Sequence, residues 1–519
     1  MKAPAHRSAE LPSGRDLRRW ARAHTVSTRS RSALLGDVYD TVLAAAVIGA
    51  MAAPYLGRLG TGSTPSGNGS TVVAPVWAVL LLILVLTRLL LDPLRRLGPL
   101  FLRPYEVTWW LPMPGDRRGL LDPVARAEMS LAVAVGAATG LLMAVVAGAE
   151  PTTAAGMILL GGSTAELLLL ALVQAQVNDA GVRGAGAAVL IAAATAFAAG
   201  VGGVPFPDHA GGALFTASGL LAGLAAVAWW WRLRTRLVDV PDARLAEVAA
   251  RNLGAQVSLL SLDTRALGRL LSAPARRPSG SSRLPLVRFA LRLPRGLRPL
   301  LGVAQADWLL LRRQPRRALQ LLAGLVIALF PVMSSGVGTV GALVFHLIGG
   351  WVAVLTLAEP ARRAWFDGGA DASWPASPLL VRCGHLLVPT VVMILWTVPV
   401  VLVRLLTAGR LPATAGEAWA VLGLVLVAGC GWAGAALRSG FRPTPDFSLG
   451  LVASPIGSLP PGAVEMLVSG PDAAALVGLP TALLAAGVSK PEQMLLAQLV
   501  ASAVVIAWGL LTGNRMLRQ

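Results

Sequence analysis

The chain is built around residues 92–128, which read DPLRRLGPLFLRPYEVTWWLPMPGDRRGLLDPVARAE. This stretch holds too many prolines and charged residues to cross a bilayer. Apolar runs of roughly 20 residues, the length of a membrane-spanning helix, nevertheless flank it closely. We therefore expect residues 92–128 to form a loop that folds against the face of a membrane.

A second, more degenerate copy of this stretch follows residue 357. Residues 358–389 read AEPARRAWFDGGADASWPASPLLVRCGHLLVP. The matching pairs, which are 264 to 267 residues apart, are Pro93 and Pro360, Arg95 and Arg362, Arg96 and Arg363, Trp109 and Trp374, Pro114 and Pro378, Arg118 and Arg382, and Pro123 and Pro389. This nearly constant offset predicts two tandem halves related by pseudo-twofold symmetry.

The composition is typical of a polytopic membrane protein. Charged residues make up 14% of the chain, against roughly 25% in ordinary soluble domains, and the mean hydropathy is +0.66. Only residues 232–317 form a polar segment long enough to bury a core of its own. Because a helix satisfies its own backbone in lipid, the predicted fold class is all-α, with about 12 membrane helices in two six-helix repeats.

Twelve apolar segments are expected to span the membrane. They cover residues 41–57, 75–91, 129–149, 154–176, 185–203, 212–231, 318–335, 339–358, 384–406, 414–436, 473–488 and 493–513. The run 448–470 contains three prolines and Glu465, and we expect a cytoplasmic or partly re-entrant connection there. The predicted parts are a basic segment (1–40), a first membrane half (41–231), a basic linker (232–317) and a second membrane half (318–519).

The placement of arginine predicts the orientation in the cell membrane. With the N-terminus inside, only Arg58, Arg404, Arg410 and Lys490 of the 45 Lys and Arg lie toward the outside. Both termini and the linker are therefore expected to be cytoplasmic. The linker has the charge of a nucleic-acid site but only two aromatic residues, Phe289 and Trp308, for base stacking. Attraction to anionic lipids explains its arginines, and no nucleic-acid partner is expected.

Each half is expected to begin with a helix that lies at the membrane surface. Near the N-terminus Leu17, Trp20, Ala21 and His24 share one helical face, with arginines between them. A disordered basic tail is the alternative for this segment. Residues 306–318, ADWLLLRRQPRRA, repeat the pattern of arginine and tryptophan before the second half.

No motif for ATP hydrolysis or metal binding occurs in the sequence. The glycine-rich loop 57–74 is not followed by lysine, and no G-x-x-x-x-G-K-[ST] is present, so ATP hydrolysis is expected from a separate chain. Cys383 and Cys430 predict neither a disulfide nor a metal site. No His, Asp or Glu cluster has the spacing of metal ligands, so we expect no metal site and no cofactor. Because the chain has no ATPase motif, we also expect no enzymatic activity in it.

Together these features resemble the permease subunits of ABC exporters of the ABC-2 type, and most closely permease-like proteins of actinobacteria in which two six-helix units are fused. The likeness lies in six spans per half, a surface helix before the first span, and a W-L-x-x-P-x-D-R-R-x-L-L turn between the second and third spans. The matching residues are Trp110, Leu111, Pro114, Asp116, Arg117, Arg118, Leu120 and Leu121. The second copy keeps Trp374, Pro378, Leu379, Leu380, Arg382 and Leu386 but lacks the D-R-R run.

The resemblance implies a mechanical role. In such permeases this loop forms a short coupling helix that sits in a groove of the partner ATPase. By that likeness, segments 92–128 and 359–385 would contact ATPase subunits through Pro114, Asp116, Arg117, Arg118, Pro378 and Arg382. An aspartate is suited to cap a helix, and arginines can donate charged hydrogen bonds to a partner. The alternative is that these arginines hold the loop on lipid headgroups; the second copy would couple less well or not at all.

Two polar side chains and four glycines inside the predicted spans carry further expectations. A charge at the position of Glu166 would cost at least about 2.5 kcal/mol, so this side chain is expected to be neutral or paired. It would either line a substrate path or be a protonated carboxyl bonded to Ser163 or Thr164. His346 is expected to be a neutral packed side chain. Close approaches between helices are expected at Gly161, Gly162, Gly429 and Gly431.

The expected function is export or flipping of an amphipathic substrate, driven by separate ATPase subunits. The alternative is a secondary transporter driven by an ion gradient, with Glu166 as its proton-linked carboxylate. A membrane-embedded lipid-modifying enzyme ranks last, because the cytoplasmic loops show no constellation of catalytic acids or histidines.

Overall fold

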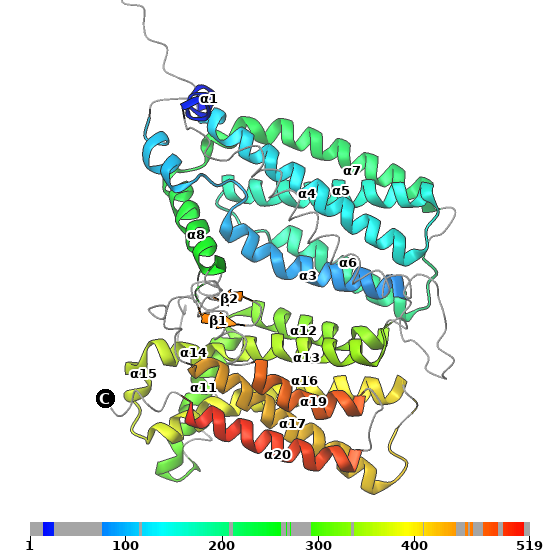
Figure 1. Ribbon diagram of the computed structural model, residues 1–519, viewed down its shortest axis with the longest axis vertical. Helices are drawn as coiled ribbons and strands as arrows, with labels where there is room; N and C mark the ends of the chain where they lie inside the picture. The colour runs from blue at the N-terminus through cyan, green and yellow to red at the C-terminus, as the bar shows by residue number, and fades with distance from the viewer. Residues whose placement is uncertain are drawn as a thin grey trace, which may run out of the picture. The chain divides into compact units, whose positions relative to one another are not determined.

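A computed structural model gives the fold of two compact units, each described by itself (Figure 1). Unit 1 consists of Met1–Ser63, Pro75–Val257 and Ala266–Leu271, and unit 2 of Thr64–Ala74, Ser258–Arg265 and Ser272–Gln519. The residues that the structure describes are 14–24, 75–113, 117–206, 211–260, 266, 270, 292–333, 337–407, 409, 411–442, 452–454, 457–459, 471–485 and 491–512.

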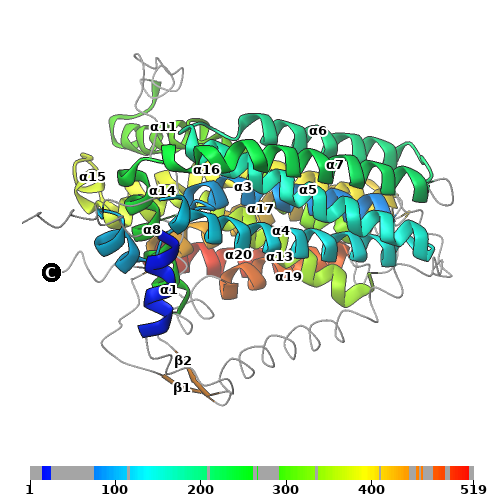
Figure 2. The same ribbon diagram turned by 90° about the horizontal axis from the view of Figure 1, so that it is seen from above.

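Unit 1 is a bundle of long apolar helices with one short helix across its end. Its described elements are α1 (Gly14–His24), α3 (Pro75–Leu97), a π-helical turn η1 (Glu106–Trp110), α4 (Arg118–Ala147), α5 (Pro151–Val177), α6 (Arg183–Val201), α7 (Gly211–Leu233), a 3-10 turn η2 (Arg234–Asp239) and α8 (Asp242–Leu260). In both views α1 lies crosswise where α4 begins (Figures 1 and 2). The structure thus shows a helix at the N-terminal position where a surface helix was predicted.

Helix α5 is the centre of unit 1, because both α4 and α7 pack along it, while α3 packs against α6. Glycines permit the closest of these contacts: a Cβ on Gly136 of α4 would lie 2.3 Å from the carbonyl oxygen of Gly161 of α5. One turn later a Cβ on Gly140 would lie 2.2 Å from the carbonyl oxygen of Met157. The predicted close approach at Gly161 is therefore confirmed, and the small residues are what let two membrane helices meet backbone to backbone.

Replacing Gly136 by alanine is expected to destabilise unit 1. The neighbour at 2.3 Å is a backbone oxygen that cannot rotate away, so α4 and α5 must separate. Overpacking of this kind costs about 1–3 kcal/mol. Gly184 in α6 is the matched control, since a Cβ there meets nothing within 4 Å. The measurement is the thermal unfolding midpoint of the purified chain in detergent. Equal midpoints for Gly136→Ala and Gly184→Ala would contradict this account of the α4–α5 contact.

Unit 2 has the same kind of architecture. Its described elements are η3 (Arg295–Leu297), α11 (Arg298–Arg312), α12 (Pro315–Met333), α13 (Thr339–Leu357), α14 (Glu359–Phe366), α15 (Gly368–Ala372), α16 (Pro378–Thr407), α17 (Ala415–Phe441), α19 (Pro471–Ala485), α20 (Pro491–Leu511) and an antiparallel pair of short strands, β1 (Val452–Ser454) and β2 (Gly457–Leu459). Within unit 2, α11, α14 and α15 lie at the same end of the long helices (Figures 1 and 2).

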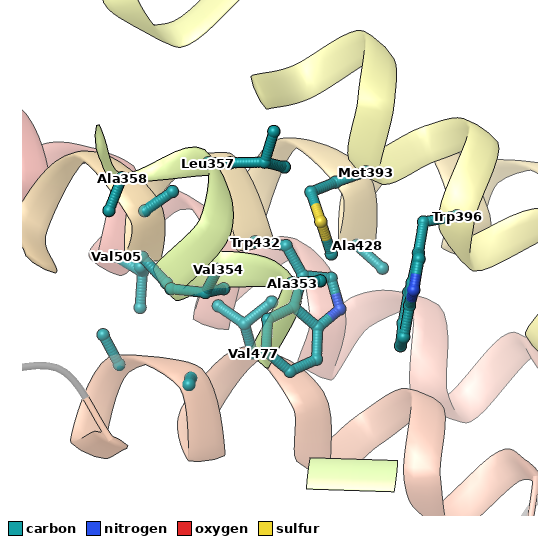
Figure 3. Close-up of a cluster of buried hydrophobic side chains, with 14 of the residues drawn as sticks. Ala353, Val354, Leu357, Ala358, Met393, Trp396, Ala428, Trp432, Val477 and Val505 are labelled. Atoms are coloured by element: carbon teal, nitrogen blue, oxygen red, sulfur yellow. The ribbon is translucent and has the colours of Figure 1, made fainter. Parts of the chain in front are cut away.

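Helix α17 is the centre of unit 2, with α16 and α20 packed along it. The core gathers around Trp432 of α17, which lies among Ala353, Val354 and Val477 with Met393 and Trp396 beside it (Figure 3). A Cβ on Gly429 would lie 2.4 Å from Ile394, and one on Gly431 2.4 Å from Ser502. Both predicted close approaches in this half are confirmed.

Ten described helices are long and apolar enough to cross a membrane. They coincide with ten of the twelve predicted spans. The predicted span 41–57 lies outside the described residues. The predicted span 473–488 overlaps α19, a shorter apolar helix over Pro471–Ala485, and residues 486–488 lie outside the described residues. Within the run 448–470 the structure shows the β1–β2 hairpin, a departure from an entirely helical chain. The protein is thus a multi-pass helical membrane protein.

Segment 92–128 differs from the loop that the sequence predicted. α3 continues through Pro93 to Leu97, and α4 begins at Arg118 and contains Pro123. Between them, Leu100, Leu102 and Leu111 are buried in one cluster with the ends of α5 and α7. The segment is therefore a packed part of unit 1, because its leucines find a protein core at the end of the bundle.

Candidate functional site

Segment 92–128 is anchored to the end of α5 by a side chain that no motif indicated. The backbone N–H of Leu100 donates to Gln176 Oε1 at 3.0 Å, and Gln176 Nε2 donates to the Leu100 carbonyl at 2.8 Å. Gly98 makes this approach possible: its φ of 69° lies in the left-handed region, and a Cβ there would meet Val248 at 2.9 Å. Since both groups of Gln176 are buried and satisfied, the segment is fixed rather than loosely placed.

A buried ion pair joins the same segment to the N-terminal helix. Glu106 is only 4% exposed, accepts a hydrogen bond from the Arg103 backbone N–H at 2.8 Å, and lies 3.2 Å from the Arg18 guanidinium of α1. Arg18 also donates to the Leu120 carbonyl at 2.9 Å. A Cβ on Gly119 would lie 2.5 Å from the backbone of Arg15, so α1 lies directly on the first turn of α4. Helix α1, segment 92–128 and α4 therefore form one connected element.

The predicted coupling residues of the first copy have contacts within unit 1. Pro114 and Asp116 lie outside the described residues. Arg117 pairs with Asp242 at 2.7 Å, and Arg118 donates to the Thr235 carbonyl at 3.2 Å. Both guanidiniums nevertheless remain partly exposed at the surface of the segment. Their role toward a partner stays a prediction.

An exposed apolar surface lies in the same segment. It consists of Tyr105, Trp109 and Met113, which we call the Trp109 surface. Their exposed fractions are 46%, 68% and 44%. Trp110 supports this surface from within, in edge-to-face contact with Tyr105 at a centroid distance of 5.6 Å. Aromatic residues, methionine and arginine are the residue types enriched at the centres of protein interfaces.

In segment 359–385 the arginines bond to groups of unit 2 itself. Glu359 is buried and pairs with Arg317 at 3.3 Å and with Arg362 and Arg363 at 3.1 Å each. Arg382, only 6% exposed, donates to the carbonyls of Leu510 and Thr512 at 2.7 Å. Cationic donors at the C-terminus of a helix satisfy its last carbonyls and stabilise its dipole. Arg382 thus caps α20, while Pro378 is exposed at the first position of α16.

A histidine flanked by two carboxylates also lies in this segment. His385 of α16 is 6% exposed; its Nδ1 lies 2.7 Å from Asp307 Oδ2 of α11, and its Nε2 lies 3.4 Å from Asp371 Oδ1 of α15. Burial raises the pKa of the Asp307 carboxyl, and the hydrogen bond with His385 opposes that shift. No local pattern in the sequence indicated this cluster, because Asp307 and Asp371 are 78 and 14 residues from His385. Only the tertiary structure brings the three together.

Packing closes segment 359–385 further. A Cβ on Gly302 of α11 would lie 2.6 Å from the ring of Trp374, so the indole lies against the α11 backbone. A Cβ on Gly384 of α16 would lie 2.7 Å from Val303, the residue after Gly302 in α11. Trp374 is therefore partly covered, whereas its sequence counterpart Trp109 is exposed.

These observations describe a chain whose sequence matches one known family. The chain belongs to DUF6297, a family of unknown function. The match covers residues 64–450, which include both segments and all three members of the His385 cluster, and it ends before α19 and α20. No curated protein and no solved structure matches the chain.

The two polar residues predicted inside spans have different surroundings in this DUF6297 protein. Glu166 in α5 is half-buried, and among the described residues it makes no hydrogen bond with Ser163 or Thr164, so the predicted carboxyl–hydroxyl pair is not formed. His346 is fully buried, lies 3.1 Å from the Thr481 hydroxyl and packs between Trp396 and Trp432, as predicted for a packed side chain. Within the described part of the chain no three His, Cys, Asp or Glu residues are placed to hold a metal ion.

Proposed function

We propose that this protein is the membrane-spanning permease subunit of an ABC-type exporter or flippase for an amphipathic substrate. Separate ATPase subunits would supply the energy, since the sequence holds no phosphate-binding loop. The observation that carries the proposal is the Trp109 surface, in the same segment as the partly exposed Arg117 and Arg118. Exposed tyrosine, tryptophan, methionine and arginine are residue types that a docking partner would bury.

The contacts around the Trp109 surface are suited to passing on a movement. Gln176 ties segment 92–128 to α5, and Glu106 ties it to α1 and, through Arg18, to the first turn of α4. α4 and α5 are themselves in backbone contact at Gly136 and Gly161. Because packed elements move as bodies, a displacement of the segment by a bound ATPase would be carried to these helices.

We further propose that the two units are six-helix repeats, for a total of twelve spans. The same order of packing supports this: α4 on α5, α5 on α7 and α3 on α6 in unit 1 correspond to α16 on α17, α17 on α20 and α13 on α19 in unit 2. Gly119 and Gly384, 265 residues apart, each meet the helix that precedes the first span of their half. Residues 41–57 would then supply the counterpart of α12.

The repeats would differ in coupling. The Trp109 surface is open, whereas Trp374 is packed on α11 and Arg382 is occupied by the α20 carbonyls. We therefore propose segment 92–128 as the main ATPase contact and segment 359–385 as the weaker one. The protein would lie in the plasma membrane with the arginine-rich end of each unit, and both termini, on the cytoplasmic side.

Substitution of Trp109 tests the docking proposal. Trp109→Ala is expected to cost about 2 kcal/mol of binding free energy, roughly thirtyfold in affinity for the ATPase, as for other interface tryptophans. Arg117→Glu with Arg118→Glu should also abolish stimulation of the ATPase by the permease. The measurement is co-purification of ATPase activity with the full chain from native membranes. The matched control is Trp419→Ala, because Trp419 is 71% exposed but lies in the first turns of α17, far from the arginine-rich end.

Three outcomes separate the alternatives. Loss of ATPase activity with Trp109→Ala but not with Trp419→Ala supports docking. Unchanged ATPase activity together with weaker binding of the variant to anionic vesicles would show that segment 92–128 holds lipid headgroups instead. Unchanged activity and unchanged vesicle binding would reject a role for this surface altogether.

A further inference from the structure

The hydrogen bonds of His385 require more protons than three separate side chains would hold at neutral pH. Each ring nitrogen faces a carboxylate oxygen, at 2.7 Å for Asp307 and 3.4 Å for Asp371. Ionised carboxylates only accept, and a neutral imidazole has a single N–H. Two contacts between these groups therefore need two protons, either both on His385 or one on His385 and one on a carboxyl. Two ionised aspartates and a neutral histidine would hold only one.

We propose that His385, Asp307 and Asp371 form a proton-binding site that fastens segment 359–385 to α11 and α16. The three side chains come from three different elements: α16, α11 and α15. Trp374 and Val303 pack beside them on Gly302 and Gly384, so the site closes a contact that is otherwise apolar. This inference stands independently of the transport function proposed above.

The surroundings of the site allow few other ways to balance its charge. On α16 itself Arg382 interacts electrostatically with Asp371, but its guanidinium is bonded to the α20 carbonyls. From α17 the neighbouring side chain is the uncharged Phe441, whose ring meets that of His385 edge-on at 5.8 Å. Asp307 and His385 are both buried, so ions from solvent can approach only Asp371, which is partly exposed. The second proton therefore stays bound, because no other cation in the described part of unit 2 bonds to either carboxylate to balance its charge.

The direction of the pH effect follows from this count. At low and neutral pH both protons are bound and both contacts exist. As pH rises past the point where the cluster releases one proton, one contact must break. The contact to Asp371 is longer and more exposed than the contact to Asp307, so it is the one expected to open. α15 and Trp374 would then be released from α11, whereas Asp307 would stay bonded to His385.

Amide hydrogen exchange of the full chain in lipid nanodiscs tests the proposal. The reporters are peptides over residues 367–377, in which the Ser373 and Trp374 amides donate to the carbonyls of Gly369 and Asp371. In the wild type, exchange corrected for its intrinsic pH dependence is expected to quicken at least roughly tenfold between about pH 6 and pH 10. His385→Gln and Asp371→Ala should exchange quickly at every pH, because each removes the contact between His385 and residue 371. Asp367→Asn, which removes an exposed carboxylate of the same segment, should keep the wild-type step.

A second measurement needs no variant. Nitrogen and carboxyl-carbon magnetic resonance spectra of the wild type at pH 7 should show two protons shared among His385, Asp307 and Asp371. A neutral His385 beside two ionised carboxyls would overturn the proposal. So would a wild type without a pH-dependent step in segment 367–377, or a step that persists in His385→Gln.

Discussion

Replacing Glu106 by alanine is expected to lower the free energy of unfolding of unit 1 by about 3–5 kcal/mol, the usual effect of removing one partner of a buried ion pair. Glu106 has a side chain only 5% exposed, and Arg18 only 17%, so the orphaned guanidinium cannot easily regain water. The Arg103 N–H would lose its acceptor as well. We expect the contact of α1 with α4 to weaken, because Arg18 would keep only its hydrogen bond to the Leu120 carbonyl.

The measurement is thermal unfolding of the purified chain together with proteolysis at the N-terminal helix. Arg19→Ala is the matched control, since Arg19 pairs with Asp16 on the exposed side of the same helix and exposed pairs contribute little. In Arg18→Ala combined with Glu106→Ala the loss should be smaller than the sum of the single losses. Additive losses would mean that the pair does not hold α1 in place.

The second large effect is expected at Trp432. Truncation to alanine should destabilise unit 2 by about 3–5 kcal/mol, because it leaves a cavity that the surrounding backbone cannot fill. The indole is fully buried, and it fits because Gly350 and Gly478 lie against it: a Cβ would come within 2.4 Å and 2.7 Å of the ring, respectively. The loss is therefore one of packing rather than of a polar contact.

Two variants make the Trp432 prediction specific. Trp432→Phe keeps an aromatic ring and should lose much less than the alanine variant. Gly350→Ala pushes on the ring and should destabilise the wild type, but it should be better tolerated when Trp432→Phe has made room. The readout is again the unfolding midpoint in detergent. If Gly350→Ala is equally harmful with either side chain at 432, the ring is not what fills the space beside Gly350.

The spans could be predicted because a membrane helix is recognisable from the length and apolar composition of its own segment. Thr339–Leu357 was predicted as 339–358 and Pro315–Met333 as 318–335, since an apolar run of sufficient length has no other stable form in lipid. The errors lie where proline was taken to end a helix. Pro93 and Pro123 both lie inside helices, as membrane bundles tolerate when neighbouring groups satisfy the freed backbone.

The contacts of the candidate site could not be predicted in the same way. Gln176 holds Leu100 across 76 residues, Arg18 reaches Leu120 across 102, and His385 meets Asp307 across 78. Nothing in the local pattern of Arg382 distinguishes a guanidinium aimed at a partner from one that caps α20. Which polar groups meet depends on which helix ends are neighbours.

The sequence by itself determined that this is a helical membrane protein and where most of its helices lie, because burial in lipid constrains each segment separately. It indicated the close approaches at Gly161, Gly429 and Gly431, whereas the predicted one at Gly162 is an ordinary contact at 3.4 Å. The tertiary structure alone decided that Trp109 is exposed while Trp374 is covered, and that one histidine lies between two carboxylates. Those outcomes depend on the packing of α1 on α4 and of α11 on α16, which no single segment encodes.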